Sequence, residues 1–583
     1  MFRLIRFLRR RDRLGILVCF GLIALQVFLD LTVPDYTQNL TASVSSGAPR
    51  MEDVLRNGGM MLLCAMGSMA ASIACGFFTA RIAARFSMTL REQLFDRITD
   101  FTDGDIHSFS VASLITRTTN DVMQMQMFVA AGLQLLIKAP MTAIWAIMKI
   151  SSASTEWTQA TMVAVGIIVV CVGVIIILCY PRFKAIQKLT DNLNAVTEEN
   201  LSGVRVIRAF NADRYRSVQF EDVNTRITRN HLFTARTTGL LMPLLTLVMS
   251  GLTLAIYWIG AYLLNQTPLL ARAGLIGSMA AFTQYAIQVV MAFIMLVAIF
   301  IIFPRVMVSG SRIMEVLNTS PSITFPGASS GVPGEVTIEF RNVSFAYQDA
   351  DDACLRDLSF TIQAGKTFAI IGGIGSGKTT LINLIPRLYD VTSGQILLNG
   401  REIQSYAQED LTRMFSLAPQ KALLFRGDVK SNVTYGTKEP VADDDPSLLR
   451  ALRIAQADFV MDLPEGLHSP VAQGGSNFSG GQKQRLSIAR AVFRKTPVVL
   501  FDDSFSALDY RTDMLVRQAL KDELRDTTVI LVAQRIGTVR HADTILVLDQ
   551  GRIAGLGTHE ELLEHCPVYR DIALSQLREE ELA

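Results

Sequence analysis

Residues 368–380 read Phe368-Ala369-Ile370-Ile371-Gly372-Gly373-Ile374-Gly375-Ser376-Gly377-Lys378-Thr379-Thr380. The apolar start is typical of a buried strand, and a helix is expected at 380–388. Glycines let the backbone of the loop wrap a phosphate, and the amides of the following helix N-terminus point at the anion. Lys378 adds positive charge, and the hydroxyl of Thr379 is suited to Mg²⁺. The stretch therefore predicts a strand–loop–helix unit of an α/β domain that holds a nucleotide by its phosphates.

Further segments with possible roles flank this loop. They are Val343-Ser344-Phe345-Ala346-Tyr347, Leu417-Ala418-Pro419-Gln420, Asn477-Phe478-Ser479-Gly480-Gly481-Gln482, the apolar strand Val498-Val499-Leu500-Phe501 with Asp502-Asp503, Ser506-Ala507-Leu508-Asp509, and Val532-Ala533-Gln534-Arg535. An aromatic face such as that of Tyr347 suits a purine ring. The small residues after Phe478 predict a second anion nest at a helix N-terminus. Asp502, at the end of a buried strand, is placed to hold Mg²⁺.

The rest of the chain has a different composition. Half of the 583 residues are hydrophobic, 19% are charged, and the mean hydropathy is +0.32, which is too apolar for an ordinary soluble protein. Nearly all long apolar runs lie before about residue 305. Six of them are long enough to cross about 30 Å of hydrocarbon. These predicted spans are 14–33, 60–80, 128–148, 157–180, 237–264 and 273–303.

Charge in the connections predicts the orientation. The N-terminal arm and the long connections after the second and fourth spans are rich in arginine and lysine, whereas the other three loops are short and carry little charge. The positive-inside rule then places both termini in the cytoplasm. The long connections are expected to be helices that continue beyond the bilayer, because structureless loops of that length are uncommon. A net charge of +2 and the lack of a basic stripe in the C-terminal half give no reason to expect nucleic acid.

Polar side chains inside the spans are few. Lys138 is taken as the one clear intramembrane charge, and Gln284 and Gln288 lie one turn apart in the sixth span. Such groups either line a substrate path or bond between helices. The pattern leaves both interpretations open.

The ordered motifs resemble those of the ATP-binding-cassette (ABC) transporters, and the resemblance covers essentially the whole chain. Segments 113–122 and 198–210 resemble the two intracellular loops of ABC exporters, although the first lacks the usual glycine near Ala112-Ser113. The resemblance implies an all-α six-helix transmembrane domain with long cytoplasmic helical extensions, followed by an α/β P-loop ABC ATPase domain. We place the transmembrane domain at 1–318, the linker at 319–335 and the nucleotide-binding domain at 336–583.

The resemblance also implies a role for each motif, with ATP and Mg²⁺ as ligands. Tyr347 would stack on adenine, Gln420 would touch Mg²⁺ with Thr379 and Asp502, and Asp509 would link two ATP sites. The nest of Ser479, Gly480, Gly481 and Gln482 would face the ATP of an opposite subunit. The remaining contacts to the bound ATP would come from the phosphate loop, that is Gly372, Gly373, Ile374, Gly375, Ser376, Gly377, Lys378, Thr379 and Thr380.

Two positions depart from the family pattern. Asp503 stands where the family usually has the glutamate that polarises the attacking water, and Gln534 stands where it usually has a histidine. Aspartate is one methylene shorter, and a misplacement of about 1 Å can cost ~10²-fold in rate. The neutral amide of Gln534 offers weaker bonds than a histidine. The pattern resembles the degenerate-site subunit of a heterodimeric, multidrug-resistance-like ABC exporter.

The sequence therefore predicts an ATPase and translocase subunit, a multi-pass protein of a bacterial plasma membrane. Its partners would be the lipid bilayer, a second homologous half-transporter and a transported small molecule or peptide. Three alternatives stay open: an exporter-shaped importer of a small chelate, an ATP-gated receptor or channel without transport, and a slow homodimeric ATPase. The cargo cannot be deduced from the apolar, methionine-containing spans.

Overall fold

A computed structural model describes residues 10–45, 50–151, 155–268, 271–325, 329, 331, 334–347, 350 and 352–576. The start of the arginine-rich arm, parts of the predicted linker and residues 577–583 lie outside this range. The chain forms two compact units. One comprises Met1–Thr99 and Ala112–Thr319, and the other comprises Asp100–Val111 and Ser320–Ala583.

All regular elements of the first unit that the structure describes are helices. Six of its helices are long and apolar enough to cross a membrane, which confirms the predicted six-span domain. In chain order the elements are α1 (Arg10–Ser45), α2 (Met51–Thr99), α4 (Val111–Thr116), the π-helical turn η2 (Arg117–Asp121), α5 (Val122–Met127), the π-helical turn η3 (Phe128–Gly132), α6 (Leu133–Ser151), α7 (Thr155–Ser202), α8 (Val204–Ala209), α9 (Asp213–Gly239), α10 (Leu241–Gln266) and α11 (Arg272–Asn318). Segments α4 to α6 form one continuous third span, Val111–Ser151.

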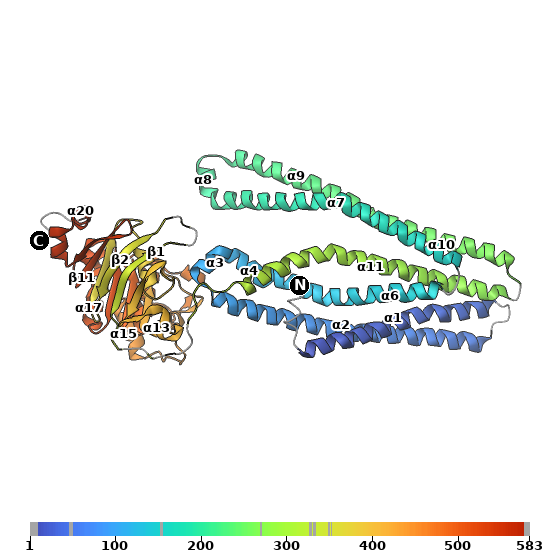
Figure 1. Cartoon of the computed structure of the whole chain (residues 1–583), viewed down its shortest axis with the longest axis horizontal. Helices are drawn as coiled ribbons and strands as arrows, with labels where there is room; N and C mark the ends of the chain where they lie inside the picture. The colour runs from blue at the N-terminus through green and yellow to red at the C-terminus, as the bar shows by residue number, and fades with distance from the viewer. Residues whose placement is uncertain are drawn as a thin grey trace. The chain divides into compact units, whose positions relative to one another are not determined.

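Several of these helices are much longer than a membrane crossing requires. Helix α2 has 49 residues and α7 has 48, or roughly 70 Å each at 1.5 Å per residue. The predicted helical extensions are thus confirmed. Helices α7 and α9 run side by side beyond the apolar part of the bundle and are joined at their ends by the short helix α8 (Figure 1).

Ion pairs tie the first helix to the third span. Lys138 lies 3.6 Å from Asp30, whose carboxylate also accepts a 2.5 Å hydrogen bond from Ser68 of α2. Farther along α1, Asp35 pairs with Lys149 at 2.6 Å. The expectation that Lys138 is the one intramembrane charge is therefore wrong, because Asp30 also lies within a span and pairs with it.

The two glutamines of the sixth span also contact α1. Gln288 donates to the carbonyl oxygen of Asp30 at 3.2 Å, and Gln284 donates to the hydroxyl of Thr37 at 3.5 Å. These contacts match bonding between helices, which is one of the two interpretations that the sequence leaves open for the glutamines.

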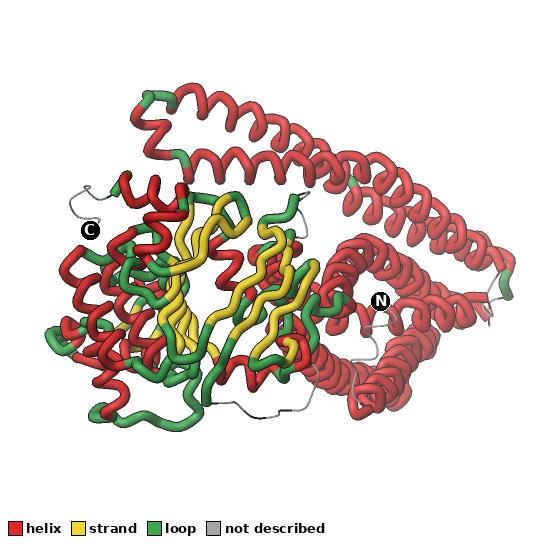
Figure 2. Tube along the Cα trace, turned by 60° about the vertical axis from the view of Figure 1, so that its left-hand side comes forward, coloured by secondary structure: helices red, strands yellow, loops and turns green. Residues whose placement is uncertain are grey.

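The second unit is an α/β domain built on two main sheets (Figure 2). A four-stranded antiparallel sheet has the order β2-β1-β4-β5, and a six-stranded sheet has the order β12-β11-β3-β10-β9-β6. In the larger sheet only β12 pairs antiparallel. The strands are β1 (Ile338–Phe345), β2 (Leu355–Ile362), β3 (Thr367–Gly372), β4 (Ser393–Leu398), β5 (Arg401–Glu402), β6 (Phe415–Ala418), β9 (Val498–Asp502), β10 (Thr528–Val532), β11 (Thr544–Asp549) and β12 (Arg552–Gly557), with a small separate ladder of β7 (Gly427–Asp428) and β8 (Pro470–Val471).

Helices complete this domain. Every residue of β9 and β10 is buried, as expected for central parallel strands covered on both faces. The covering helices include α12 (Lys378–Leu384), α13 (Gln408–Met414), α14 (Val429–Val433), α15 (Pro446–Ile454), α16 (Gly480–Phe493), α17 (Tyr510–Glu523), α18 (Ile536–Val539), α19 (His559–His565) and α20 (Pro567–Leu574). Helix α12 ends before the predicted residue 388, where Arg387 has a positive φ of 58°.

The short helix α3 (Asp103–Phe109) belongs to the second unit, although it follows α2 in the chain. Tyr389 donates a 2.8 Å hydrogen bond to Asp103, and the carboxylate of Asp105 accepts one from the backbone amide of Ser322 at 3.1 Å. Partial burial by itself would raise the pKa of Asp105, but hydrogen bonds from Thr102 and Ser322 outweigh it and lower the pKa. Helix α3 lies in the connection between the second and third spans, just before the segment 113–122 that resembles the first intracellular loop of ABC exporters.

Candidate nucleotide site

The candidate site lies where three adjacent parallel strands end. In the order β3-β10-β9, Val532 is in register with Ile370 on one side and with Asp502 on the other. The phosphate loop follows β3, Asp503 follows β9, and Gln534 follows β10. Because the carboxyl ends of parallel strands meet at one edge, three segments distant in sequence converge there.

The loop has the backbone that its glycines predict. Gly375 and Gly377 have φ values of 79° and 97°, a region that L-residues with side chains rarely occupy. The ammonium of Lys378 donates to the carbonyl oxygens of Gly372 and Gly373 at 2.9 and 2.6 Å. Burial lowers the pKa of Lys378, and the nearby carboxylates of Asp503 and Asp502 oppose that shift.

Two glycines of the loop have no room for a side chain. A Cβ at Gly372 would overlap the carbonyl oxygen of Leu548, and one at Gly377 would come within 2.6 Å of the Leu355 side chain. At Gly373 a Cβ would meet nothing within 4 Å. The loop is thus packed on its inner side and open on the other, which fits a backbone cradle for a phosphate chain.

Two oxygen donors lie together beside the loop. The hydroxyl of Thr379 donates to Oδ1 of Asp502 at 3.2 Å. Burial, with the charge of Asp503 adding to it, raises the pKa of Asp502 to about 6 although Thr379 and Lys378 favour the carboxylate. A hydroxyl and a carboxylate are ligands that Mg²⁺ prefers. These residues fit the predicted metal position, and a bound Mg²⁺ would supply positive charge at the phosphates.

Asp503 is surrounded by amides. Its Oδ2 accepts a 2.9 Å hydrogen bond from Nε2 of Gln534 and a 3.5 Å contact from Nε2 of Gln420. Its own backbone is left-handed, with φ at 47°, a conformation that aspartate tolerates better than most residues. Burial raises the pKa of Asp503, and these amides and Lys378 partly offset the effect. The structure therefore brings the two altered positions into direct contact.

Tyr347 lies at the edge of the site. Its hydroxyl is 3.0 Å from the hydroxyl of Thr380 in the helix that follows the loop, and its ring is 38% exposed. Phe345 and Tyr389 contact the ring edge-on, so its orientation is fixed. An exposed aromatic face remains for a purine.

The nest at Ser479 is a helix N-terminus with a complete capping box. Ser479 accepts from the amide of Gln482, and Gln482 accepts from the amide of Ser479 at 2.9 Å. Phe478 is buried and packs against Phe459. Asp509 caps α17 through Thr512, and these bonds lower its pKa. Within the described part of the chain, neither Ser479 nor Asp509 has a hydrogen bond to the phosphate loop.

One residue of the site had no signal in the sequence. Gln576, just after α20, donates to the carbonyl oxygen of Gln534 and accepts from the amide of Ile536, both at 2.8 Å. It lines a cavity of about 320 Å³ together with Asp503, Gln534 and others. The two bonds hold the segment after β10 at Gln534 and Ile536, the residues on either side of Arg535. A lone glutamine near a chain end matches no motif, and only the tertiary structure places it here.

Comparisons with known proteins agree with this architecture. The profile described as "ABC transporter transmembrane region" matches residues 16–293, and that described as "ABC transporter" matches residues 355–506. An uncharacterised ABC transporter ATP-binding protein of Mycobacterium tuberculosis is 37% identical over 522 residues, covering 89% of this chain and 87% of that protein. The chain therefore belongs to the ABC transporter family.

Other relatives extend the similarity. An uncharacterised ABC transporter ATP-binding protein of Bacillus subtilis is 33% identical, with 90% of each chain covered. An ATP-dependent lipid A-core flippase of Haemophilus influenzae is 29% identical, covering 85% of this chain and 83% of the flippase. The solved structure of a bacterial Atm1-family ABC exporter with ATP bound has a TM-score of 0.81 at 23% identity and covers 98% and 99% of the two chains. The fold is thus that of an ABC exporter.

Proposed function

We propose that this chain is one half of a heterodimeric ABC exporter, with an ATP site of its own that holds ATP well and cleaves it poorly. The observation that carries the proposal is the 2.9 Å hydrogen bond between Gln534 and Asp503, beside a phosphate loop with every expected residue in place. The residues that bind ATP are retained, whereas both residues that act on water and the γ-phosphate are changed. This combination favours a binding site over a hydrolytic one.

The contacts of Asp503 support slow cleavage. A general base must lie within about 2.6–3.2 Å of the proton it takes, directly or through a water. Oδ2 of Asp503 instead accepts from the amide of Gln534, so an attacking water would have to share that oxygen or reach Oδ1. The shorter side chain then has to reach the water from a left-handed backbone position. Both effects reduce the population of a productive geometry.

The nest at Ser479 supports a division of labour. In the proposed pair it completes the hydrolytic site of the partner, which supplies its own glutamate and histidine. ATP-driven closure of the two nucleotide domains would turn the spans from inward- to outward-facing, and hydrolysis at the partner's site would reset them. The cargo is a small molecule or peptide, and both termini lie in the cytoplasm.

The end of the α7–α9 extension supports a second subunit. Helix α8 has no buried residue, and large apolar side chains around it are exposed, among them Leu201, Val206, Phe210 and Tyr215. Phe210 alone is 79% exposed. Large exposed apolar side chains gathered at the end of a helix hairpin are a common mark of a surface that another protein covers. The nucleotide domain of a partner half-transporter is the occupant we propose.

The ATPase rate of the purified chain tests this function. In the absence of any other half-transporter, the chain should bind ATP at its phosphate loop but turn it over only at a background rate. Lys378→Ala provides the matched control, because it removes the ammonium at the loop and should abolish binding. Rapid ATP hydrolysis by a homodimer of the unmodified chain would overturn the proposal.

A further inference from the structure

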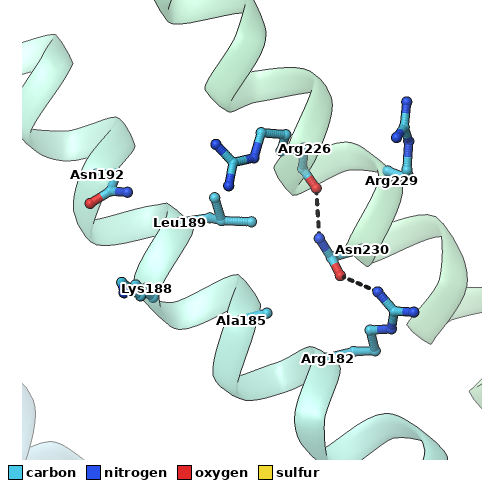
Figure 3. Close-up of a pocket in the computed structure, with 8 residues that line it drawn as sticks. All are labelled: Arg182, Ala185, Lys188, Leu189, Asn192, Arg226, Arg229 and Asn230. Atoms are coloured by element: carbon cyan, nitrogen blue, oxygen red, sulfur yellow. Dashed lines mark hydrogen bonds between the residues drawn. The ribbon is translucent and has the colours of Figure 1, made fainter.

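A basic cavity lies between the extensions of α7 and α9, outside the nucleotide site. It has a volume of about 440 Å³ and eight lining residues (Figure 3). Arginine and lysine supply four of them, asparagine two, and no carboxylate is among them. The lining residues are Arg182, Ala185, Lys188, Leu189, Asn192, Arg226, Arg229 and Asn230.

The cavity has a fixed polar wall. Arg182 donates to Oδ1 of Asn230 at 3.2 Å, and Asn230 in turn donates to the carbonyl oxygen of Arg226 at 2.8 Å (Figure 3). The guanidinium of Arg182 also lies over the ring of Phe233, 5.0 Å from its centre. These contacts hold Arg182 in one orientation, so less side-chain freedom is lost when its remaining N–H groups bind an anion.

The charges around the cavity are only partly compensated. Arg226 has an ion pair with Asp222 at 3.7 Å, whereas Asp191 accepts from Gln187 rather than from a lining cation. In the part of the chain that the structure describes, the side chains of Lys188 and Arg229 have neither an ion pair nor a hydrogen bond. A solvated basic helix face would also leave cations unpaired, but it would not gather them from two helices around a cavity whose lining includes the buried Leu189.

The position of the cavity indicates the source of the anion. Arg182 follows the apolar stretch 157–180 by two residues, and Asn230 precedes the stretch 237–264 by seven. At 1.5 Å per residue Arg182 lies about 3 Å and Asn230 about 10 Å from the hydrocarbon edge, so the end of the cavity at Arg182 lies at the depth of lipid headgroups. Exposed Tyr180 and Phe183 flank the cavity on the same helix, as aromatic residues commonly do at this interface.

We propose that this cavity binds a phosphate-bearing anion, with the headgroup phosphate of an anionic phospholipid as its ligand. Arginine forks match phosphate oxygens in pairs, and basic pockets on the cytoplasmic side of membrane helices suit such headgroups. The inference rests on the proposed insertion, in which the α7–α9 extension leaves the membrane on the cytoplasmic side. A bound lipid would brace the two helices where they emerge from the bilayer.

Native mass spectrometry of the full chain in detergent, without nucleotide, tests the proposal. The probes are phosphatidylglycerol, phosphatidylcholine and glycerol 3-phosphate, added in separate titrations. The unmodified chain should retain phosphatidylglycerol in preference to phosphatidylcholine, and Arg182→Gln with Arg229→Gln should weaken that binding by roughly tenfold or more. Arg91→Gln with Arg97→Gln, which removes equal charge from α2, should leave it unchanged.

The outcomes separate the possible ligand sources. One outcome is that the chain binds glycerol 3-phosphate, loses this binding in the first double variant, and shows no preference for phosphatidylglycerol. That result would keep the anion site but assign it to a soluble phosphate ester. Equal retention of every probe by the unmodified chain and both double variants would overturn the proposal. Arg182→Lys keeps the charge but loses the fork, so it should weaken binding less than Arg182→Gln does, and its remaining binding guards against a variant that fails to fold. Because no ATP is present, these results are independent of the proposed ATPase behaviour.

Discussion

Nε2 of Gln534 lies 2.9 Å from Oδ2 of Asp503, so the two residues that depart from the usual ABC site are hydrogen-bonded to each other. An amide–carboxylate bond of this length is a stable, charge-assisted contact. It takes up one acceptor position of the carboxylate and fixes its orientation, so an attacking water would have to share Oδ2 or use Oδ1. The two substitutions are thus one structural unit, and each is best understood with the other.

Restoring both residues should restore hydrolysis. Asp503→Glu with Gln534→His is expected to raise ATP turnover at this site by at least tenfold, because a positioned general base contributes ~10²–10⁴-fold. The measurement is steady-state phosphate release by the purified chain.

Each single variant serves as a control and should gain less than the pair. In Asp503→Glu alone, Gln534 can still donate a hydrogen bond to the new carboxylate, and the backbone at this position stays left-handed. Gln534→His alone leaves the shorter acid of Asp503 in place. No gain from the double variant would refute the geometric explanation.

The adjacent glycines Gly372 and Gly373 should differ sharply in how well they tolerate substitution by alanine. Gly372→Ala places a methyl group against the carbonyl oxygen of Leu548 and should destabilise the nucleotide domain by about 1–3 kcal/mol. Gly373→Ala meets nothing within 4 Å and should change stability by less than ~1 kcal/mol. Thermal unfolding of the full chain in detergent checks both. Equal melting temperatures for the two variants would contradict the packing described for the inner side of the loop.

The buried Asp502 should make the ligand-free domain less stable at higher pH. Its folded pKa of about 6 lies above the usual 3.8, so between these values the folded state holds the proton that the unfolded state has lost. Stability therefore falls as pH rises from about 4 through 6. Asp502→Asn removes this penalty and should stabilise the nucleotide-free, metal-free chain by ~2 kcal/mol at pH 7.5, with the gain shrinking towards pH 4.

Unfolding of both proteins across that pH range provides the measurement. A gain from Asp502→Asn that stays constant with pH would show that the carboxylate is not the cause. Asp503→Asn offers a comparison, because the same burial raises the pKa of Asp503 as well.

The intramembrane pair of Asp30 and Lys138 should behave as a unit. Lys138→Met leaves Asp30 without its cation inside the bundle and should destabilise the chain by on the order of 1–2 kcal/mol. Adding Asp30→Asn to Lys138→Met should recover most of that loss, because no unpaired charge remains. Melting temperatures in detergent of the two single variants and the double variant measure the coupling. Additive losses would show that the pair does not interact.

The fold followed from patterns that are local in the sequence. Apolar length alone gave six spans, and one strand–loop–helix motif defined the α/β domain. Asp30 lies within the first span, but a single acid hardly changes the hydropathy of its neighbours, so the span is recognisable without it. Its pairing with Lys138, by contrast, depends on how α1 packs against the third span.

Contacts within the site were less predictable. The roles of Lys378, Thr379 and Asp502 follow from motif chemistry, whereas the Asp503–Gln534 bond depends on the register of β9 and β10, which no local pattern encodes. Gln576 and the cavity between α7 and α9 are products of tertiary packing. Residues scattered over a long helix pair form a basic cavity only once the helices lie side by side.

The central claim is that this chain holds ATP without cleaving it, and trapped-nucleotide analysis of the assembled transporter tests it most directly. The complex is allowed to turn over, nucleotide is retained by rapid gel filtration, and ATP and ADP are counted per complex. The account predicts one intact ATP per complex, lost on Lys378→Ala in this chain, with ADP confined to the partner's site. Recovery of ADP alone, at two per complex, would contradict it.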